Sequence, residues 1–250
     1  MVKEPHKKVE HPFNRLQAEL ERIIRQTKPG DRLLSEPQLA RQLGVSRATL
    51  REGMRTFEAQ GLIRRRQGVG TFVVGETRVI ESGLEVLESI ERLASRSGLT
   101  VSMGDLLVSE KPADPVAAEK LAVPAGTSLV QISRVIYADQ RPVAYLVDML
   151  LPDIITEMEL TTGFTGSVLD FLEKRGDPAL NRSFTEIQAV PATAVIARSL
   201  EIQRGDVLLL FTARLIDSTE RIIDYSLSYF LPGYFRFHVI RRIENKGSRF

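Results

Sequence analysis

Arginine and hydroxyl side chains gather at one point of the chain, straight after a short turn. Arg47, Thr49 and Arg51 follow Ser46, whose hydroxyl is suited to cap the first turn of a helix. Side chains at the start of a recognition helix reach base edges in the major groove, and arginine is the usual partner of guanine O6 and N7. The free N–H groups of a helix N-terminus also attract phosphate. This cluster therefore indicates contact with double-stranded DNA.

Three short helices are expected to position the cluster. Apolar residues recur at helical spacing from Asn14, which we expect to cap the first helix, to a Pro-Gly stop. Ser35 is expected to begin a second helix that ends at Gly44, and Ser46 a third that runs to Gly61. The turn between the last two helices is typical of a helix-turn-helix. The expected apolar faces are Leu16, Leu20, Ile23 and Ile24, then Leu39, Ala40 and Leu43, then Leu50, Met54 and Phe57.

A basic hairpin is expected to follow the third helix. Residues 62–74 hold two short apolar runs joined by a glycine-containing turn, and the first run carries Arg64, Arg65 and Arg66. Taken alone, three adjacent arginines are as easily a solvated charge run. Their position directly after the helices favours a wing that lies along a groove of DNA.

Charge is distributed unevenly along the 250 residues. The net charge is only +2, but residues 1–75 hold 15 basic and 8 acidic side chains, a net of +7, and the rest hold 19 and 24, a net of −5. The basic first domain is therefore expected to bind a polyanion, and the acidic second domain is not. The length favours two domains. The absence of cysteine excludes disulfides, thiolate metal sites and a cysteine nucleophile.

The first third of the chain resembles the winged helix of GntR-type bacterial transcription regulators. The resemblance is nearly continuous over residues 13–74, and its motifs stand in a fixed order. They are Pro29–Glu36, Leu39–Ala40, Leu43–Arg47, Thr49–Glu52 and Gln67–Val73. The resemblance implies operator contacts in the major groove by Ser46, Arg47, Thr49 and Arg51, and in the minor groove by Gln67 and Gly68 of the wing.

One departure from the family concerns a phosphate contact. The family usually has an arginine after the Ser35-Glu36 pair, where Pro37 stands here, and Arg32 or Arg41 is expected to substitute for it. Residues 1–11 are expected to be a flexible arm, and residues 12–75 the DNA-binding domain. The residues expected to contact DNA are Arg32, Ser35, Ser46, Arg47, Thr49, Arg51, Arg66, Gln67 and Gly68.

The rest of the chain carries an internal repeat. Two six-residue segments that begin at Val116 and Val195 resemble each other, and a glycine follows each of them. Each copy then runs an apolar strand to an arginine, Arg134 or Arg214, a polar turn, and a second strand that ends in Leu-Pro. The period is 79 residues between the glycines and 80 between the arginines and between the prolines. Agreement at so many ordered positions indicates a duplication.

The duplication predicts an α+β domain. Because a short polar turn joins only antiparallel neighbours, two copies of helix, strand, turn and strand predict four main strands in antiparallel pairs. Neither copy is expected to be stable alone, so both should share one sheet with helices on one face. A helix between Gly166 and Gly176, capped by Ser167, is expected to connect them.

The segment between the two domains is interpreted as a linker. Residues 76–92 are expected to lead into a short amphipathic helix, and residues 93–250 to form the second domain. The expected apolar positions of that helix are Leu84, Leu87, Ile90, Leu93 and Ala94.

The second domain resembles the UTRA effector domain of HutC-like GntR regulators, which has the chorismate-lyase fold with an antiparallel sheet and flanking helices. The resemblance covers about residues 85–242 and is looser than that of the winged helix. Its matching stretches are Val123–Gly126, Arg134 with Ala138–Asp139 and Pro142, Leu151–Pro152, Gly166–Ser167, Leu200 with Gly205, and Ile223–Ser226 with Phe235–Phe237. A helical effector domain does not fit the histidine content of this chain. An aminotransferase-like domain does not fit its length.

Arg134 is the effector contact that the residues themselves indicate. In an alternating strand it shares a face with Ile132 and Ile136, and an arginine among apolar side chains must find an anion or another hydrogen-bonding partner. An internal ion pair with Asp224 or Asp148 is the alternative.

The UTRA resemblance implies further effector contacts. They are Ser89, Ser167 on a helix N-terminus, and Asp224, where glutamate is commoner in the family, in addition to Arg134. Ile136 stands where sugar-phosphate sensors commonly have a second arginine, and Phe230 where an aromatic hydroxyl is expected. A glutamate expected before the first Leu-Pro is also missing. A less charged or monocarboxylate effector is therefore expected.

Together these features predict a ligand-responsive transcription regulator, a repressor that a small metabolite releases from its operator. It is expected to bind operator DNA as a homodimer in the cytoplasm, without a cofactor. No membrane association is expected, because its apolar runs are far shorter than the roughly 20 residues that span a bilayer. The three histidines lack metal-ligand spacing, so no metal site is expected, and no catalytic constellation is visible. The alternatives are an enzyme of chorismate-lyase-like fold and a DNA-binding protein without a ligand.

Overall fold

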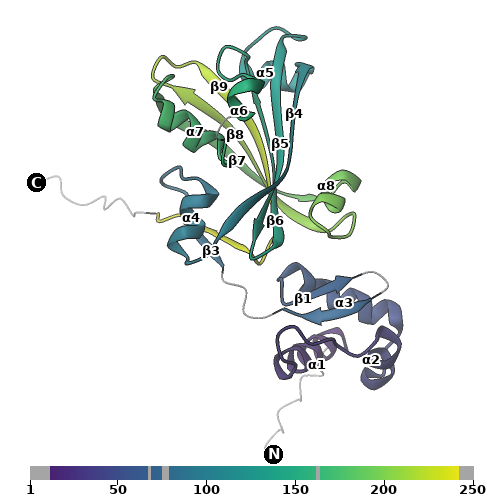
Figure 1. Cartoon of the computed structure of the whole chain (residues 1–250). Coiled ribbons are helices and arrows are strands. Elements are labelled where there is room, and N and C mark those ends of the chain that lie inside the picture. The colour runs from purple at the N-terminus through teal and green to yellow at the C-terminus, as the bar shows by residue number, and fades with distance from the viewer. Residues whose placement is uncertain (1–11, 67–68, 75–78, 162–163, 242–250) are drawn as a thin grey trace, which may run out of the picture. The chain divides into compact units, whose positions relative to one another are not determined.

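The structure, a computed structural model, describes residues 12–66, 69–74, 79–161 and 164–241. The chain divides into two units, Met1–Thr77 and Arg78–Phe250, whose elements are labelled in Figure 1. In the ranges that the structure describes, no helix is both long and apolar enough to cross a membrane.

The first unit is a winged helix, as expected. Its elements are α1 (Pro12–Gln26), α2 (Glu36–Leu43), α3 (Arg47–Ala59), β1 (Ile63–Arg66) and β2 (Gly70–Val73). The two strands pair antiparallel, with Arg65 opposite Thr71. One expectation is wrong: α1 begins at Pro12, so Asn14 lies inside the first turn and does not cap the helix. Proline suits this start because its ring fixes φ near the helical value and the first turn needs no N–H donor.

The core of the first unit follows the periodicity of the sequence. The predicted apolar faces of all three helices meet in one cluster, which Leu33, Ile63 and Val73 complete. Gly53 lets α1 and α3 approach closely, because a Cβ added there would lie 3.0 Å from Leu16 Cδ2. Gln17 Nε2 also donates to Gly53 O at 3.0 Å. The recognition helix α3 is therefore fixed along its length against α1.

The second unit holds the remaining elements. They are β3 (Ile80–Gly83), α4 (Ile90–Arg96), β4 (Val101–Pro112), α5 (Pro115–Leu121), β5 (Ser128–Ala138), β6 (Arg141–Leu150), α6 (Glu157–Thr161), α7 (Val168–Arg175), β7 (Leu180–Pro191), α8 (Ala194–Ser199), β8 (Val207–Asp217), β9 (Ile222–Phe230) and β10 (Phe235–His238).

An antiparallel sheet with the order β4-β5-β6-β9-β8-β7 dominates the second unit (Figure 1). The predicted hairpins β5–β6 and β8–β9 form its centre, so the two copies of the repeat meet at β6 and β9. Each copy also has an edge strand, β4 or β7, that the sequence did not predict. Most positions of both edge strands are exposed or half-exposed, so neither carries an apolar alternation.

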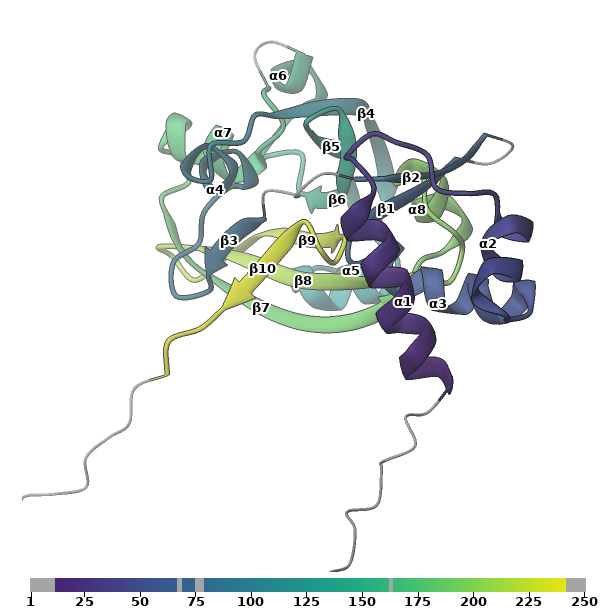
Figure 2. The ribbon, with the colours of Figure 1, turned by 90° about the horizontal axis from the view of Figure 1, so that it is seen from below.

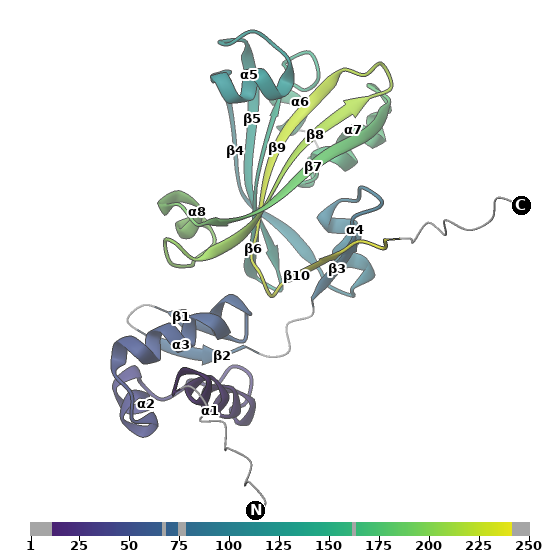
Figure 3. The same cartoon turned by 180° about the vertical axis from the view of Figure 1, so that it is seen from behind.

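Helices cover both faces of this sheet, which corrects the expectation of one face (Figures 1 and 3). On one face α7 packs on Ile132 and Leu150. On the other face α5 packs on Leu129 and Tyr225. The helix α8 lies on the same face as α5, against Val135 and its neighbours. Both faces of β5 are buried, so both require a cover.

A second, two-stranded sheet joins the start and the end of this unit. The strands β3 and β10 run parallel with Ile80 opposite Phe235 (Figure 2). Residues 80–92, assigned to the linker from the sequence, here form β3, a loop and the start of α4 within the second unit. The helix begins only at Ile90, where Ser89 caps it, and Leu84 and Leu87 lie outside it with 40% and 46% of their surface exposed.

Candidate DNA-reading surface and effector cavity

The start of α3 presents the side chains that the sequence singled out. Ser46 caps the helix, since its Oγ accepts a hydrogen bond from Thr49 N at 3.1 Å and lies 2.8 Å from Thr49 Oγ1. Arg47 is exposed and forms no side-chain hydrogen bond or ion pair with any residue in the described ranges. A guanidinium in this position keeps all its donors for an outside partner.

Glu36 ties the recognition helix to its neighbours. Its Oε2 accepts from Arg51 Nε at 2.7 Å, and its Oε1 accepts from Arg65 on β1. Arg51, expected to contact DNA, is therefore paired with a carboxylate in this structure. Ser35, also in the expected set, begins α2, and the side-chain oxygen of Gln38 accepts from its N–H at 3.2 Å and its hydroxyl at 2.6 Å.

Arg32 lies beside the wing. Its backbone forms an isolated bridge to Phe72, and Leu33 N donates to Thr71 O at 2.8 Å. The Arg32 side chain covers the backbone of Gly70, whose φ of +141° only glycine adopts readily. The backbone of Arg66 belongs to β1, but Gln67 and Gly68 lie outside the described residues, as does the side chain of Arg66.

The second unit contains a cavity of about 770 Å³ between the α7-bearing face of the sheet, α4, β3 and β10. The four residues expected to contact an effector, Ser89, Arg134, Ser167 and Asp224, all line it. Ser89 caps α4, Arg134 lies on β5, Ser167 caps α7 and Asp224 lies on β9. Cavities of this size hold metabolite-sized ligands.

Arg134 is buried, and its guanidinium is occupied. Nε donates to Gly166 O and Nη1 pairs with Asp148 Oδ2, while the guanidinium carbon lies 5.6 Å from the centre of the Phe164 ring. Asp148 reaches it because Leu146 is opposite Arg134 and residues two apart on β6 share a face. The ion pair that the sequence left open is therefore formed, with Asp148.

Asp224 lies next to this pair without a cation of its own. It is 4% exposed, and its Oδ1 has no hydrogen-bond partner among the described residues. Burial, and then the charge of Asp148, raise the pKa of Asp224 well above the usual value, against an opposing effect of Arg134. A buried carboxyl oxygen without a donor is rare and calls for a partner.

Glu91 is a cavity residue that the sequence did not indicate. Burial raises the pKa of its carboxyl, despite favourable hydrogen bonding and the nearby Arg134. A Cβ added to Gly166, which has a φ of +119°, would lie 3.1 Å from Glu91 Oε1. A single glutamate on a seven-residue helix has no pattern that separates it from a surface residue, so no sequence signal could have found it.

The two predicted serines serve as caps and join α4 to α7. Ser89 Oγ accepts from Arg92 N at 3.2 Å and donates to Asp170 Oδ2 at 2.7 Å. Ser167 Oγ accepts from Asp170 N at 3.0 Å. Arg92 in turn pairs with Asp170 Oδ1 at 2.6 Å and with Glu173. This α4–α7 network fixes the two helices that close the cavity opposite the sheet.

The repeat does not give the cavity two equivalent arginines. Ala213 lies 79 residues after Arg134, matching the glycine period, and lines the cavity. Arg214, the repeated arginine, comes one residue later and lies over the ring of Phe184 with 4.8 Å between its guanidinium carbon and the ring centre. Since successive strand residues face opposite sides, one residue of slip places Arg214 on the other face.

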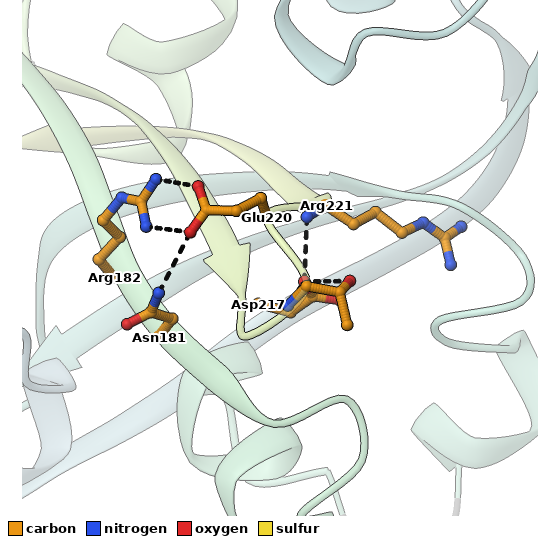
Figure 4. Close-up of polar contacts among 6 residues, drawn as sticks. Asn181, Arg182, Asp217, Glu220 and Arg221 are labelled. Atoms are coloured by element: carbon orange, nitrogen blue, oxygen red, sulfur yellow. Dashed lines mark hydrogen bonds and ion pairs between the residues drawn. The ribbon is translucent and has the colours of Figure 1, made fainter.

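Arg182, on β7, is the second arginine that lines the cavity. Its guanidinium donates to both carboxylate oxygens of Glu220, to Oε1 at 2.6 Å (Figure 4). Glu220 belongs to the predicted polar turn between β8 and β9. There Asp217 Oδ1 accepts from Thr219 N at 2.8 Å and from Arg221 N at 3.0 Å, which keeps Glu220 within reach (Figure 4).

Comparison with known proteins identifies both units. Residues 13–73 match the bacterial regulatory proteins of the gntR family, and residues 96–236 match the UTRA domain. The mannosyl-D-glycerate transport/metabolism system repressor MngR of Escherichia coli (strain K12) is 30% identical over 237 residues, which cover 92% of this chain and 94% of that protein. The histidine utilization repressor of Klebsiella aerogenes is 31% identical over 214 residues, covering 82% of this chain and 83% of that protein.

Solved structures share the fold. PhnF from Mycobacterium smegmatis aligns with a TM-score of 0.62 and 24% identity, covering 92% of this chain and 100% of that chain. The effector domain of the same protein aligns with a TM-score of 0.59 and 21% identity, covering 66% of this chain and 100% of that chain. The chain belongs to the GntR family of bacterial transcription regulators, in the HutC-like subfamily whose members carry a UTRA domain.

Proposed function

We propose that this protein is a repressor that binds operator DNA through its winged helix and leaves the DNA when a small effector fills the cavity of the UTRA unit. The observation that carries the proposal is that Ser89, Arg134, Ser167 and Asp224, far apart in the sequence, line one cavity. The relatives MngR and the histidine utilization repressor, both named repressors, support the direction of regulation.

The DNA contacts are assigned from side-chain position where the structure describes it, and from the family resemblance for Arg66, Gln67 and Gly68. Ser46, Arg47 and Thr49, at the exposed start of α3, contact bases in the major groove. Arg51 also contacts the DNA bases, once its ion pair with Glu36 is broken. Arg32 and Ser35 contact phosphate, and Arg66, Gln67 and Gly68 form the wing contacts in the minor groove.

The repressor acts as a homodimer on a palindromic operator. A two-fold pair sets its recognition helices one DNA turn apart, about 34 Å, which matches the half-site spacing of helix-turn-helix dimers. Operator DNA as the partner supports a location in the cytoplasm. The proposed repressor has no catalytic activity.

The route from effector to DNA begins at β3. The cavity wall includes Ser82 and Gly83 of β3 together with Phe235 and Phe237 of β10. Ile80, the first residue of β3, follows the last residue of the winged-helix unit by only three positions. An effector that moves β3 therefore acts on the segment that leads to the DNA-binding unit. A coupling of about 1–3 kcal/mol would change operator affinity about 5- to 150-fold.

Two measurements on the full chain test the proposal. Selection from random-sequence DNA should enrich a palindrome, and a metabolite library should contain a compound that both raises the melting temperature and releases that palindrome. A ligand at 100 times its dissociation constant adds about 2.7 kcal/mol of stability. Enrichment of no sequence over random DNA would contradict the repressor function. A stabilising compound that leaves operator affinity unchanged would contradict regulation through the cavity.

A further inference from the structure

Most ionisable side chains that line the cavity are carboxyls. Among the described lining residues, six are acidic and two are basic, Arg134 and Arg182. Arg134 is already paired with Asp148. Arg182 is already paired with Glu220 (Figure 4). The acidic lining residues are Glu85, Glu88, Glu91, Asp148, Glu173 and Asp224. An anionic ligand entering this cavity would meet two guanidinium groups that are already paired with carboxylates.

Three of these carboxyls are not matched by a cation within the described residues, namely Glu85, Glu91 and Asp224, and Glu85 accepts a hydrogen bond from Ile240 N. Glu88 pairs with Arg96, and Glu173 with Arg92. Glu91 and Asp224 form no ion pair with any residue in the described part of the chain. Both line the cavity, Glu91 from α4 and Asp224 from the sheet strand β9.

Asp224 adds an unfilled hydrogen-bond acceptor. Its side chain is more than nine-tenths buried, and Oδ1 has no donor among the described residues. Buried polar atoms almost always have a partner, and leaving one unpaired costs about 1–3 kcal/mol in protein variants. A ligand that brings an N–H group to this oxygen would remove that cost.

Part of the lining is aromatic. Phe211, Phe230, Phe235 and Phe237 line the cavity as one cluster, with ring centres 4.4 Å apart for Phe211 and Phe237 and 4.7 Å for Phe230 and Phe235. Phe230 and Asp224 lie on the same face of β9, six residues apart along the strand. The cavity lining therefore combines carboxyls with an apolar phenylalanine cluster.

We propose that the effector is an organic cation, with a protonated amine that donates to Asp224 and Glu91 and an apolar body that packs against the phenylalanine cluster. The inference rests on the proposed function, that this cavity holds the effector. A carboxylate or phosphate effector is disfavoured, because such a group would have to displace Asp148 from Arg134.

Cation binding should release protons. In the empty cavity, burial raises the pKa of both Glu91 and Asp224, so each holds a proton to higher pH than an ordinary carboxyl. A bound ammonium stabilises the ionised forms and reverses this effect. Arg134 on β5 and Asp170 on α7 act on Glu91, and Arg134 and Asp148 on β6 act on Asp224. The other charged lining residues are Arg182 on β7, Glu173 on α7, and Glu85 and Glu88 on the loop before α4.

Three probes with one body and different head groups test the proposal. We would titrate the full chain with 4-phenylbutylamine, 4-phenylbutan-1-ol and 4-phenylbutanoate at pH 7 by isothermal titration calorimetry. The amine should bind at least about tenfold more tightly than the alcohol, a difference of about 1.4 kcal/mol, and the carboxylate most weakly. Titrations in buffers of different ionisation enthalpy should show proton release with the amine.

Matched variants identify the carboxyls that recognise the amine. Asp224→Asn keeps the shape and should remove most of the preference for the amine over the alcohol, and Glu91→Gln should reduce it independently. Asp153→Asn is the control, because Asp153 pairs with Arg221 at an exposed position and does not line the cavity. Melting temperatures establish that each variant is folded.

The outcomes separate this inference from the proposed function. Equal or tighter binding of the carboxylate, or an unchanged amine preference in both cavity variants, overturns the cationic effector. Failure of all three probes to bind also overturns it. In each of these cases the release of operator DNA by a library metabolite remains an independent result, and only its absence counts against the proposed function.

Discussion

Arg47 is the residue on which base recognition depends most directly. It is exposed at the first position of α3, and the structure gives its guanidinium no side-chain partner within the described ranges. We expect Arg47→Ala to lose about 1–3 kcal/mol of discrimination, roughly 5- to 150-fold, between operator and random DNA. Fluorescence anisotropy with both DNAs at one fixed salt concentration measures this ratio, because phosphate contacts are strongly salt-dependent.

Arg55→Ala supplies the matched control for Arg47. Arg55 lies two turns further along α3, where it pairs with Glu52 at 3.4 Å, and its side chain is 55% exposed. We expect its removal to leave the affinity ratio nearly unchanged. An equal loss of operator and random-DNA affinity in the Arg47 variant would mean that Arg47 contacts phosphate and does not read bases.

Asp224 gives the stability of the protein a defined dependence on pH. Its pKa is raised in the folded state, mainly by burial, so the folded protein binds its proton more tightly than the unfolded chain does. The stabilisation from this group is complete below the usual aspartate pKa and is lost as pH rises through the raised value. Glu91 acts in the same direction. Each pH unit over which the two states differ by one proton is worth about 1.4 kcal/mol.

Asp224→Asn should therefore flatten the pH profile. The variant cannot ionise, so its free energy of unfolding should gain on the wild type as pH rises from about 4 towards 8. Urea unfolding across that range measures the difference. The exposed Asp153→Asn variant should follow the wild-type curve closely. A difference between Asp224→Asn and wild type that stays constant with pH would show that Asp224 is ionised throughout.

At the scale of elements, α4 and α7 depend on one serine. Ser89 caps α4 and donates to Asp170 Oδ2 on α7, so Ser89→Ala removes a cap and a connection between the helices. Loss of an N-cap hydroxyl costs about 0.5–2 kcal/mol, and Asp170 also loses a buried donor. We expect a lower melting temperature and weaker effector binding, measured by thermal unfolding and calorimetry.

Ser97→Ala is the control for Ser89, because Ser97 lies at the other end of α4 and its hydroxyl donates only to Leu93 O at 3.2 Å. Its replacement should cost less than that of Ser89 and leave effector binding unchanged. Equal effects of the two variants on effector binding would show that the α4–α7 network does not shape the cavity.

Elements with strong local signals could be predicted from the sequence. Ser35, Ser46 and Ser167 each begin a helix where their capping chemistry and the apolar periodicity agree. The edge strands β4 and β7 could not be predicted, because their largely exposed positions lack the alternation that marks a buried strand. The strands β3 and β10 could not be predicted for a different reason, because each has only four residues and they pair across more than 150 positions.

The cavity was predictable only in part. Arg134 could be found because a charge among apolar strand residues needs a partner, and Ser89, Ser167 and Asp224 followed from the family resemblance. Glu91 could not be found, nor the phenylalanine cluster, because the cavity draws single residues from segments that only the tertiary fold brings together. The choice of Asp148 over Asp224 as the partner of Arg134 was likewise set by strand register.

At the scale of the whole molecule, β10 connects the cavity to the start of the second unit. Phe235 is 6% exposed and packs on Phe230, and its strand pairs with β3. Phe235→Ala should destabilise the second unit by about 3–5 kcal/mol, the usual cost of removing a buried phenylalanine. Operator DNA should still be bound, because the winged helix has a separate core, but the response to effector should weaken.

Hydrogen exchange measures this effect segment by segment. Amides of residues 80–83 should exchange faster in the Phe235 variant, while those of α3 keep their wild-type rates. Phe184→Ala is the control, since Phe184 is 50% exposed on the edge strand β7 and does not line the cavity. Wild-type exchange in β3 together with a wild-type effector response would show that β10 does not link the cavity to β3.

The one-residue slip between Arg134 and Arg214 limits how many effectors one chain takes. Two equal halves of a duplicated sheet would provide two equal ion-pair centres, but Ala213 stands where the second arginine would face the cavity. The stoichiometry should therefore be one effector per chain, which makes two in the proposed homodimer. Operator release should then follow an effector titration whose Hill coefficient does not exceed two, however strongly the two chains are coupled.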